Sequence, residues 1–517
     1  MRTPRSLASR GALLAAALVL GLAAPAGAAI RSLWIVHTTD FHGAVLGGAK
    51  DRASNRPIGG SAVLAAHVNR VRAEYPGAVL LLDGGDAFQG TAISNLVRGR
   101  SVVDVMNAMG YDAMAVGNHE FDWGLDTLFA RMLQARFPFL SANIYERAVG
   151  ERASWVKPYA IIERAGVKIG VIGITTPSAA YTTLPGNVAH LEFRDPTDIV
   201  NAIVPEVRAA GAEIVVVLAH EGGQQRRDGS VEGPIAAIAK GAAGVDGVFG
   251  GHSHTWVSGR VGGRPVIISS SNGRALGVMR LDWDDAAKMV VGAEPTVETA
   301  FADSIAPDSN VAAVVAEYEK AIGPAMARVV ATAAKNLERG SPEQPLGILI
   351  ADVIRRAAGT DFAMQNPGGV RTDIAAGPIT VAKVYELMPF DNLILKYSLS
   401  GGQVKRILED GLAYGRAMQI SGLKFTYEPG RPEGNRITSL VLASGAPLDT
   451  TDTYTLATND FLAGGGDGME TLKSIADYTN TNELVRDEIL AWFEEETAAG
   501  RPIVPPEPGR IKEEEAK

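Results

Sequence analysis

Five short polar clusters contain most of the residues that could do chemistry. They are Asp40-Phe41-His42, Gly85-Asp86, Gly117-Asn118-His119-Glu120, His220-Glu221 and Gly251-His252-Ser253-His254. Five of the eight histidines in the chain lie in these clusters, and the chain has no cysteine. Histidine and carboxylate ligands without sulfur suit Zn, Mn, Fe or a related divalent ion, and the lack of cysteine excludes thiolate metal sites and thiol nucleophiles.

Each cluster follows a segment that we expect to be a buried strand, at residues 33–39, 78–83, 112–116, 213–219 and 245–249. In α/β sheets, ligands bind beyond the carboxyl ends of the strands. Two cations about 3.5–4 Å apart can activate a water and stabilise the leaving oxygen of a phosphate ester. Such a pair needs a bridging carboxylate, for which Asp86 is the natural candidate, and Asn118 offers a neutral ligand.

The elements that must position these clusters predict two domains. Residues 33–283 alternate apolar runs, including further strands at 167–174 and 265–270, with amphipathic helices at 61–75, 125–136 and 197–210. Apolar strands separated by helices are typical of an α/β domain. We expect a signal peptide (1–28), an α/β domain (29–305), a linker (306–328) whose helix runs over 310–323 between Pro307 and Pro324, a second domain (329–510) and a solvated charged tail (511–517).

The second domain should mix both kinds of element. Helices are expected at 346–358, 381–387 and 403–414, and strands at 393–399, 422–427, 437–443 and 454–458. This mixture predicts an α+β fold.

The first 28 residues have the pattern of a secretory signal. Three arginines precede an apolar run at 11–22, and Ala26-Gly27-Ala28 fits a cleavage site. The run is shorter than the about 20 residues that span a bilayer, although an uncleaved N-terminal anchor is the alternative. The sequence therefore predicts a periplasmic or secreted bacterial protein without a stable membrane anchor.

The net charge is −9 and no run of Lys or Arg occurs. A nucleic-acid polymer or an anionic membrane is therefore a poor candidate partner, whereas a small anion could still be captured locally. No obligate protein partner is evident from the sequence.

A second set of motifs lies in the C-terminal half. It comprises Asn366-Pro367-Gly368-Gly369-Val370-Arg371, Met388-Pro389-Phe390-Asp391-Asn392 and the loop at 459–468. Phe390 and Phe461 could sandwich a flat heterocycle, and such stacking contributes about 1–3 kcal/mol per base. The alternative is that both rings are core side chains.

Taken together, the N-terminal clusters resemble the signature of the calcineurin-like metallophosphoesterases. The forms of the motifs at 39–43, 117–122 and 251–255 are similar to the 5′-nucleotidase branch. This resemblance covers nearly all of the chain after residue 28. It implies an N-terminal four-layer α/β sandwich, joined by a helix to a smaller α+β substrate-binding domain.

The resemblance also implies a role for each residue of the clusters. One metal ion would be held by Asp40, His42, Asp86 and His254, and the other by Asp86, Asn118, His220 and His252. His119 matches the catalytic histidine of the family, and Asp122 matches the carboxylate that orients it. We expect Glu120 and Asp83 to be structural, and His37, His67 and His190 to take no part in the chemistry.

In the second domain, Phe390 and Phe461 match the two rings that stack on the base. By position, Asn366, Asn392 and Asp467 would contact base or ribose, Gly368 and Gly369 would form the adjacent turn, and Arg371 would bind the phosphate end or ribose. Arg339 matches a further substrate arginine. Pro367 and Ile348 depart from the family pattern, in which glycine and asparagine are usual.

The implied activity is hydrolysis of nucleoside 5′-phosphates with two divalent ions, Zn, Mn or similar. The alternatives are a UDP-sugar or dinucleotide hydrolase, a 2′,3′-cyclic nucleotide phosphodiesterase with 3′-nucleotidase activity, a sulfur-ester hydrolase, and a nucleotide-binding protein without catalysis. The last would be expected to have lost metal ligands, and the sequence retains the full set.

Overall fold

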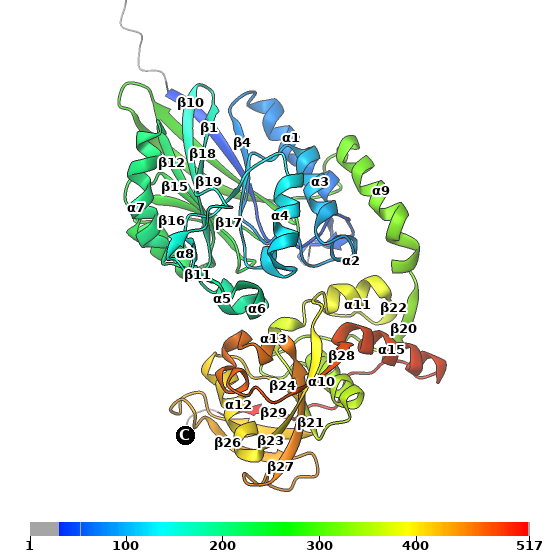
Figure 1. Ribbon diagram of the computed structural model, residues 1–517. Helices are drawn as coiled ribbons and strands as arrows, with labels where there is room; N and C mark the ends of the chain where they lie inside the picture. Colours follow the sequence, from blue (N-terminus) through cyan, green and yellow to red (C-terminus); the bar gives the residue numbers. More distant parts are fainter. Residues whose placement is uncertain (1–29, 52, 515–517) are drawn as a thin grey trace, which may run out of the picture.

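The computed structural model describes residues 30–51 and 53–514, which form two domains joined by helix α9 (Ser309–Met326) (Figure 1). The expected signal peptide lies outside the described residues. Within the described ranges, no helix has the length and apolar character needed to cross a membrane.

The N-terminal domain contains two six-stranded sheets. The strands of the first are, in order across the sheet, β19 (Met289–Thr299), β18 (Ala275–Asp284), β1 (Ile30–Thr38), β4 (Val79–Asp83), β5 (Ala113–Ala115) and β6 (Phe139–Leu140). Those of the second are β16 (Trp256–Val261), β17 (Arg264–Ser269), β15 (Gly247–Gly250), β12 (Ile214–His220), β10 (Val167–Thr175) and β9 (Tyr159–Arg164).

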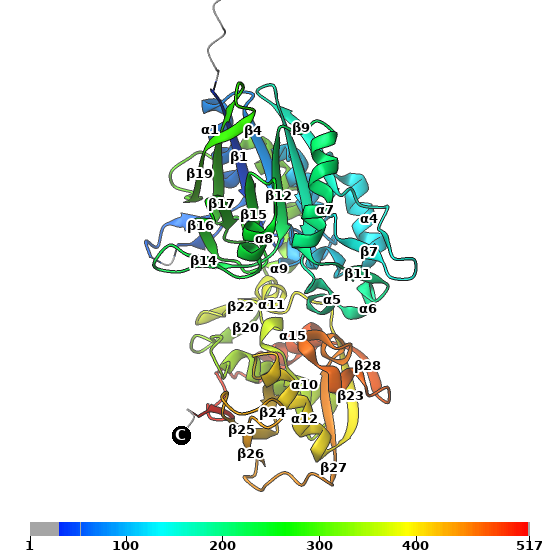
Figure 2. The same ribbon diagram turned by 90° about the vertical axis from the view of Figure 1, so that its left-hand side faces the viewer.

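The central strands of each sheet, such as β4, β10 and β12, are buried on both faces, which explains why they are almost wholly apolar. Along β1, Ile35 packs into the core between the sheets and Val36 into the core under the outer helices, because successive side chains point to opposite faces. The first sheet is covered by α1 (Ser61–Glu74), α3 (Arg100–Met109) and α4 (Gly124–Gln134), and the second by α7 (Pro196–Ala209) and α8 (Pro234–Gly241) (Figure 2). The predicted four-layer α/β sandwich is confirmed.

Short elements connect these layers. They are α2 (Ala92–Asn95), α5 (Ala179–Thr182), α6 (Pro185–Val188), β2 (Ala49–Lys50), β3 (Pro57–Ile58), β7 (Ile144–Glu146), β8 (Glu151–Arg152), β11 (Leu191–Phe193), β13 (Gln224–Gln225) and β14 (Val231–Glu232).

The linker helix begins where the Asp308 side chain accepts hydrogen bonds from the backbone N–H groups of Asn310 and Val311. It was expected to stop before Pro324, but it continues to Met326. Pro324 lies in the last turn, where its missing N–H removes one helical hydrogen bond and only two helical residues follow the ring. Val311 and Val315 are buried in the core beneath α1 and α3, so α9 packs as part of the N-terminal domain.

The C-terminal domain has a five-stranded sheet between two helical layers. Its order is β24 (Gln419–Ser421), β21 (Phe362–Gln365), β27 (Thr453–Asn459), β23 (Leu393–Ser400) and β28 (Thr479–Leu484). One face packs against α10 (Pro345–Ala358), α11 (Val381–Leu387) and α15 (Val485–Ala498), and the other against α12 (Gly401–Ala413), α13 (Asp460–Ala463) and α14 (Glu470–Lys473). A two-stranded sheet, β20 (Val329–Ala333) with β22 (Gly377–Thr380), completes the mixed domain.

The C-terminal segment differs from the expected solvated tail. Residues of β29 (Ile511–Glu513) pair in parallel with β25 (Leu423–Tyr427), which also pairs with β26 (Ile437–Leu442). Ile511 is buried in the core, and the Tyr427 hydroxyl donates to Glu513 Oε2 at 2.7 Å. Ile511, which precedes the charged residues, therefore anchors this segment as far as residue 513.

Candidate active site

The polar clusters meet at one edge of the sandwich. Strands β1, β4 and β5 are parallel neighbours in the first sheet, and β12 and β15 are parallel neighbours in the second. Their carboxyl ends therefore project the five clusters toward a common point, as the sequence predicts.

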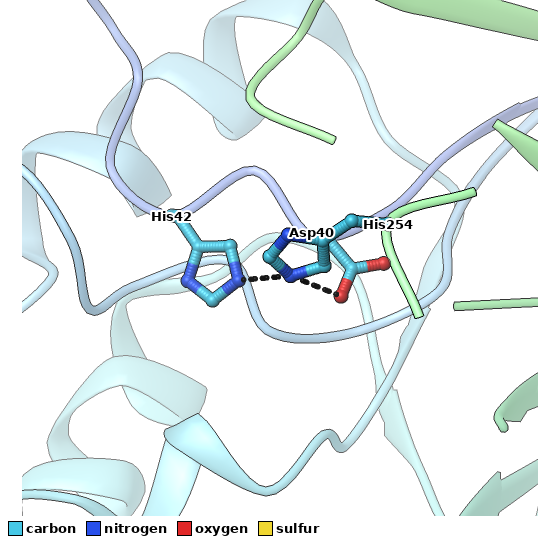
Figure 3. Close-up of side chains that lie close together, drawn as sticks. All are labelled: Asp40, His42 and His254. Atoms are coloured by element: carbon cyan, nitrogen blue, oxygen red, sulfur yellow. Dashed lines mark hydrogen bonds and ion pairs between the residues drawn. The ribbon is translucent and has the colours of Figure 1, made fainter. Parts of the chain in front are cut away.

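Asp40, His42 and His254 form the first donor group (Figure 3). The two Nε2 atoms of His42 and His254 are 3.0 Å apart, and His254 Nε2 is 3.3 Å from Asp40 Oδ1. The Nδ1 atom of His42 donates to the Gln89 carbonyl oxygen at 2.8 Å. This leaves the lone pair of His42 on Nε2, facing the other donors.

Asp86, His220 and His252 form the second donor group, whose ligand atoms all lie within 4.8 Å of one another. His220 Nε2 is 3.0 Å from Asp86 Oδ2, and its Nδ1 donates to the Gly84 carbonyl oxygen at 2.8 Å. Asn118 lines a cavity together with Asp86 and His252. Its Oδ1 atom is buried and has no hydrogen-bond partner among the described residues, so it remains available for a ligand.

The backbone at these donors is strained. Five of the seven candidate ligands have a positive φ, namely Asp40, His42, Asp86, His252 and His254. Non-glycine residues in this region cost about 1–3 kcal/mol each and persist where the surroundings hold them in place. Gly117 cannot be replaced without movement, because a Cβ there would lie 2.2 Å from Asp86 Oδ1.

The electrostatics of the two groups differ, and a metal ion at the second group would have to displace a proton from His220. Burial, assisted by the charge of His254, holds the pKa of His42 well below its usual range, as a neutral ligand requires. Burial also lowers the pKa of His220, but the carboxylates of Asp86 and Asp40 outweigh it and raise that pKa to about 10. Buried negative charge of this kind is stable only when paired or coordinated to metal.

His119 and Asp122 are in contact beside the second donor group. His119 Nδ1 is 2.8 Å from Asp122 Oδ2, and His119 Nε2 is 3.9 Å from Asp86 Oδ2. Burial lowers the pKa of His119, but the charges of Asp122 and Asp86 outweigh it and the pKa is raised. This arrangement presents Nε2 of the imidazole toward the donor groups, where it could act as a proton donor.

A cavity of about 580 Å³ extends from this point between the two domains, and we refer to it as the interdomain cavity. It is lined by Asp86, Asn118, His119, Asp122, His252 and His254 of the N-terminal domain, and by Asn366, Gly368, Gly369, Arg371, Phe390, Asn392, Phe461 and Asp467 of the C-terminal domain. The rings of Phe390 and His119 are 5.7 Å apart. The structure thus brings residues from both predicted sets to one cavity, although Asp40, His42 and His220 do not line it.

The amides predicted to contact a substrate already have protein partners. Asn366 Nδ2 donates to Asp467 Oδ2 at 2.9 Å, and Asn392 Nδ2 donates to Asp460 Oδ1 at 2.8 Å. Pro367, which departs from the family pattern, begins a short 3₁₀ turn over Pro367–Gly369, and Ile348 is buried inside α10.

Arg371 and Arg339 occupy different places. Arg371 lines the interdomain cavity, with its guanidinium 5.9 Å from the Phe390 ring centroid, and burial lowers its pKa. Arg339 does not line that cavity, but it lines a second cavity together with His42, His254 and Arg371. Its side chain pairs with Asp373 at 3.1 Å and donates to the carbonyl oxygen of Arg371 at 3.0 Å.

Residues 182–184, Trp123, Tyr414, Arg416 and Asp460 also line the interdomain cavity, and sequence reasoning missed them. Tyr414-Gly415-Arg416 directly follows α12, so an aromatic and a planar cation beside a glycine turn were the available signal. Residues 182–184 have no motif of their own.

The polar residues expected to be structural have internal partners. Asp83 accepts hydrogen bonds from the Thr38 hydroxyl and the Gly85 N–H, and Glu120 accepts from the N–H groups of Asp86, Ala87 and Gly117. His37 Nδ1 lies 2.7 Å from Ser269 Oγ, outside the donor groups.

Comparison with known proteins agrees with the two-domain fold. Residues 33–256 match the model of the calcineurin-like phosphoesterases, and residues 326–474 match that of the 5′-nucleotidase C-terminal domain. The chain is 31% identical to a snake venom 5′-nucleotidase of Gloydius brevicauda, over 85% of this chain and 82% of that protein. It is also 31% identical to Endonuclease YhcR of Bacillus subtilis, over 77% of this chain but only 34% of that longer protein.

The solved structure of a 5′-nucleotidase precursor from Thermus thermophilus superposes with a TM-score of 0.83 at 30% identity, over 93% of this chain and 99% of that one. Fold and donor groups together define a metal-dependent phosphoester hydrolase. More specifically, the chain belongs to the 5′-nucleotidase family.

Proposed function

We propose that this protein is a secreted phosphohydrolase that converts nucleoside 5′-phosphates to nucleoside and phosphate with the help of two divalent ions. The observation that supports this most directly is the shared cavity. Its N-terminal wall carries Asp86 and His119, and its C-terminal wall carries Phe390 and Phe461. A nucleotide is the kind of ligand that offers a phosphate to one wall and a flat base to the other.

In this proposal Asp40, His42 and His254 would hold one ion, Asn118, His220 and His252 would hold the other, and Asp86 would serve as a ligand in both sites. Bound ions would attract the phosphate and make a water a stronger nucleophile near neutral pH. Zn and Mn suit the histidine–carboxylate donors. The protein contributes a fixed geometry, since hydrogen bonds to Gln89 and Gly84 orient His42 and His220.

His119 would donate a proton from Nε2 to the ribose oxygen as the ester bond breaks. Asp122 holds Nδ1 of the ring and stabilises the charged imidazolium before the transfer. Arg371 would bind the phosphate end or the ribose, because its cation faces the same cavity.

The base would stack between Phe390 and Phe461, and Asn366, Asn392 and Asp467 would contact base or ribose beside the turn at Gly368 and Gly369. Arg339 would support Arg371 by donating a hydrogen bond to its backbone carbonyl oxygen. Secretion rests on the sequence of residues 1–28, and N-terminal sequencing of exported protein would test it.

A second candidate substrate is a nucleotide whose phosphate carries another group, such as a UDP-sugar or a dinucleotide. The observation that favours it is a second cavity of about 1000 Å³, which also reaches His42, His254 and Arg371. It extends past Trp256 and Leu46 and so offers room beyond a bound phosphate.

The test is a substrate screen on metal-free protein reloaded with Zn, Mn or Mg. The panel comprises nucleoside 5′-phosphates, 2′,3′-cyclic nucleotides, UDP-sugars, dinucleotides and p-nitrophenyl phosphate. The highest kcat/KM for 5′-monophosphates would support the proposal, and a higher value for UDP-sugars or dinucleotides would favour the second candidate. Hydrolysis of p-nitrophenyl phosphate without turnover of any nucleotide would refute both.

A further inference from the structure

One short segment of the N-terminal domain, residues 181–187, runs from the end of α5 into α6 and contacts the stretch of chain that carries His119. The Thr182 carbonyl oxygen accepts from Asn118 Nδ2 at 3.3 Å. Asn187 Nδ2 donates to the carbonyl oxygens of Phe121 and Asp122 at 2.9 and 3.0 Å. Between these two anchors, the Thr183 hydroxyl donates to Asp122 Oδ1 at 2.8 Å.

The Asp122 carboxylate is thereby divided between two partners. Its Oδ2 faces His119 Nδ1 and its Oδ1 accepts from Thr183. Thr183 is only 2% exposed, so water has little access to replace its hydroxyl. A hydrogen bond to a charged oxygen is about twice as strong as a neutral one, and it fixes the rotation of the carboxylate.

We infer that Thr183 is a positioning residue for the Asp122–His119 pair, which it orients through the carboxylate without touching the substrate's reacting atoms. This inference rests on the proposed function, because it assumes that His119 protonates the leaving oxygen. Orientation by outer partners typically changes activity about 10–100-fold in comparable sites.

The same segment also contacts the substrate domain. These contacts help to fix the position of Thr183. The rings of Tyr181 and Tyr414 meet edge to face at 6.1 Å, and Pro185 packs beside Gly464. Residues 182–184 also line the interdomain cavity. The C-terminal domain therefore packs against the segment that orients Asp122.

The experiment compares Thr183→Val, which keeps the shape and removes the hydroxyl, with Thr183→Ser, which keeps the hydroxyl. Thr360→Val is the matched control, because Thr360 is also buried but donates to the Phe362 carbonyl oxygen in the other domain. Metal content and melting temperature are measured for each variant, and Thr183→Ala replaces the valine variant if the latter does not fold.

We expect Thr183→Val to lower kcat for a nucleoside 5′-phosphate about 10-fold, with KM within about twofold and both metals retained. The loss should be smaller for p-nitrophenyl phosphate, because its leaving group needs no proton, and Thr183→Ser should recover most of the nucleotide activity. Equal loss on both substrates, no loss, or no rescue by serine would overturn the inference. Absence of nucleotide hydrolysis by the unchanged protein would instead refute the proposed function.

Discussion

Asp86 is the residue that connects the second donor group with the candidate acid His119. Its Oδ1 accepts from the backbone N–H of His119 at 2.8 Å, and its Oδ2 lies 3.0 Å from His220 Nε2. Its backbone adopts a φ of 57°, held by the hydrogen bond from its N–H to Glu120. A single carboxylate thus links the proposed metal ligands to the position of the histidine.

Asp86→Ala should empty at least one metal site and abolish turnover. Two ions bound about 3.5–4 Å apart would need a shared anion between them. Metal content by elemental analysis and kcat measure the result. Asp228→Ala is the control, because Asp228 lies in an exposed loop and accepts hydrogen bonds from Ser230. A protein without Asp86 that keeps both metals and near-normal activity would contradict the assignment.

Phe390→Ala or Phe461→Ala should weaken nucleotide binding by about 1–3 kcal/mol and spare p-nitrophenyl phosphate, which has no base. KM for both substrates is the measurement. Phe129→Ala is the matched control, since Phe129 packs against Trp155 outside the interdomain cavity. If KM rises equally for both substrates, the rings are core residues and do not form a base site.

At this scale, the sequence predicts the ligand clusters well, because each follows a parallel strand and such strands end at one edge. Arg339 is an example of a contact that the sequence does not predict. Its distance along the chain from Arg371 cannot reveal that the Arg339 side chain donates a hydrogen bond to the carbonyl oxygen of Arg371. Tyr414 and Asp460 are likewise brought to the cavity only by the packing of α12 and α13.

At the scale of elements, the loop from Pro389 to Asn392 is held by the first residues of α15. The N–H of Val485 donates to the Asn392 carbonyl oxygen at 3.0 Å. Arg486 is 5% exposed, donates to the carbonyl oxygens of Pro389 and Phe390 at 3.4 Å, and pairs with Asp391 at 2.6 Å. Its guanidinium stacks 4.1 Å from the Tyr385 ring centroid, so helix α15 fixes the loop that carries Phe390.

Arg486→Lys should therefore raise KM for nucleotides about fivefold while leaving kcat for p-nitrophenyl phosphate unchanged. A lysine retains the charge but loses the planar fork and the stacking, at a cost of about 1 kcal/mol. Arg356→Lys is the control, because Arg356 also contacts α15 but only through the exposed Glu495. Equal KM values for the two variants would show that α15 does not position the loop.

Helix α15 itself was not predicted, and neither were the long strands β18 and β19. The alternating pattern of β19 is exposed on one side and resembles a polar loop more than a buried strand. The strands and helices that position the donor groups were predicted within a few residues, because they are buried and strongly periodic. The segments that the sequence misjudged, at Pro324 and Ile511, depend on packing against distant elements.

At the scale of the whole molecule, several contacts between the two domains lie close to the interdomain cavity. Asn95 Nδ2 of α2 donates to the Pro389 carbonyl oxygen at 2.7 Å, and Pro389 belongs to the loop that carries Phe390. Tyr181 with Tyr414, and Pro185 with Gly464, make further contacts. Helix α9 joins the domains along one side (Figure 1). Such an interface permits rotation of one domain against the other.

We expect turnover to require this rotation, because a nucleoside held between Phe390 and Phe461 beside His119 can leave only when the walls of the interdomain cavity separate.

Pro185→Cys with Gly464→Cys would lock the present arrangement. A Cβ at Gly464 would lie 3.3 Å from the Pro185 ring atoms, and the chain has no native cysteine to compete. Oxidation of the double variant should lower steady-state turnover about 10-fold or more, and reduction should restore it. The two single-cysteine variants, treated in the same way, control for oxidation itself. Full turnover by a protein in which the bridge has formed quantitatively would show that substrate enters and product leaves without domain motion.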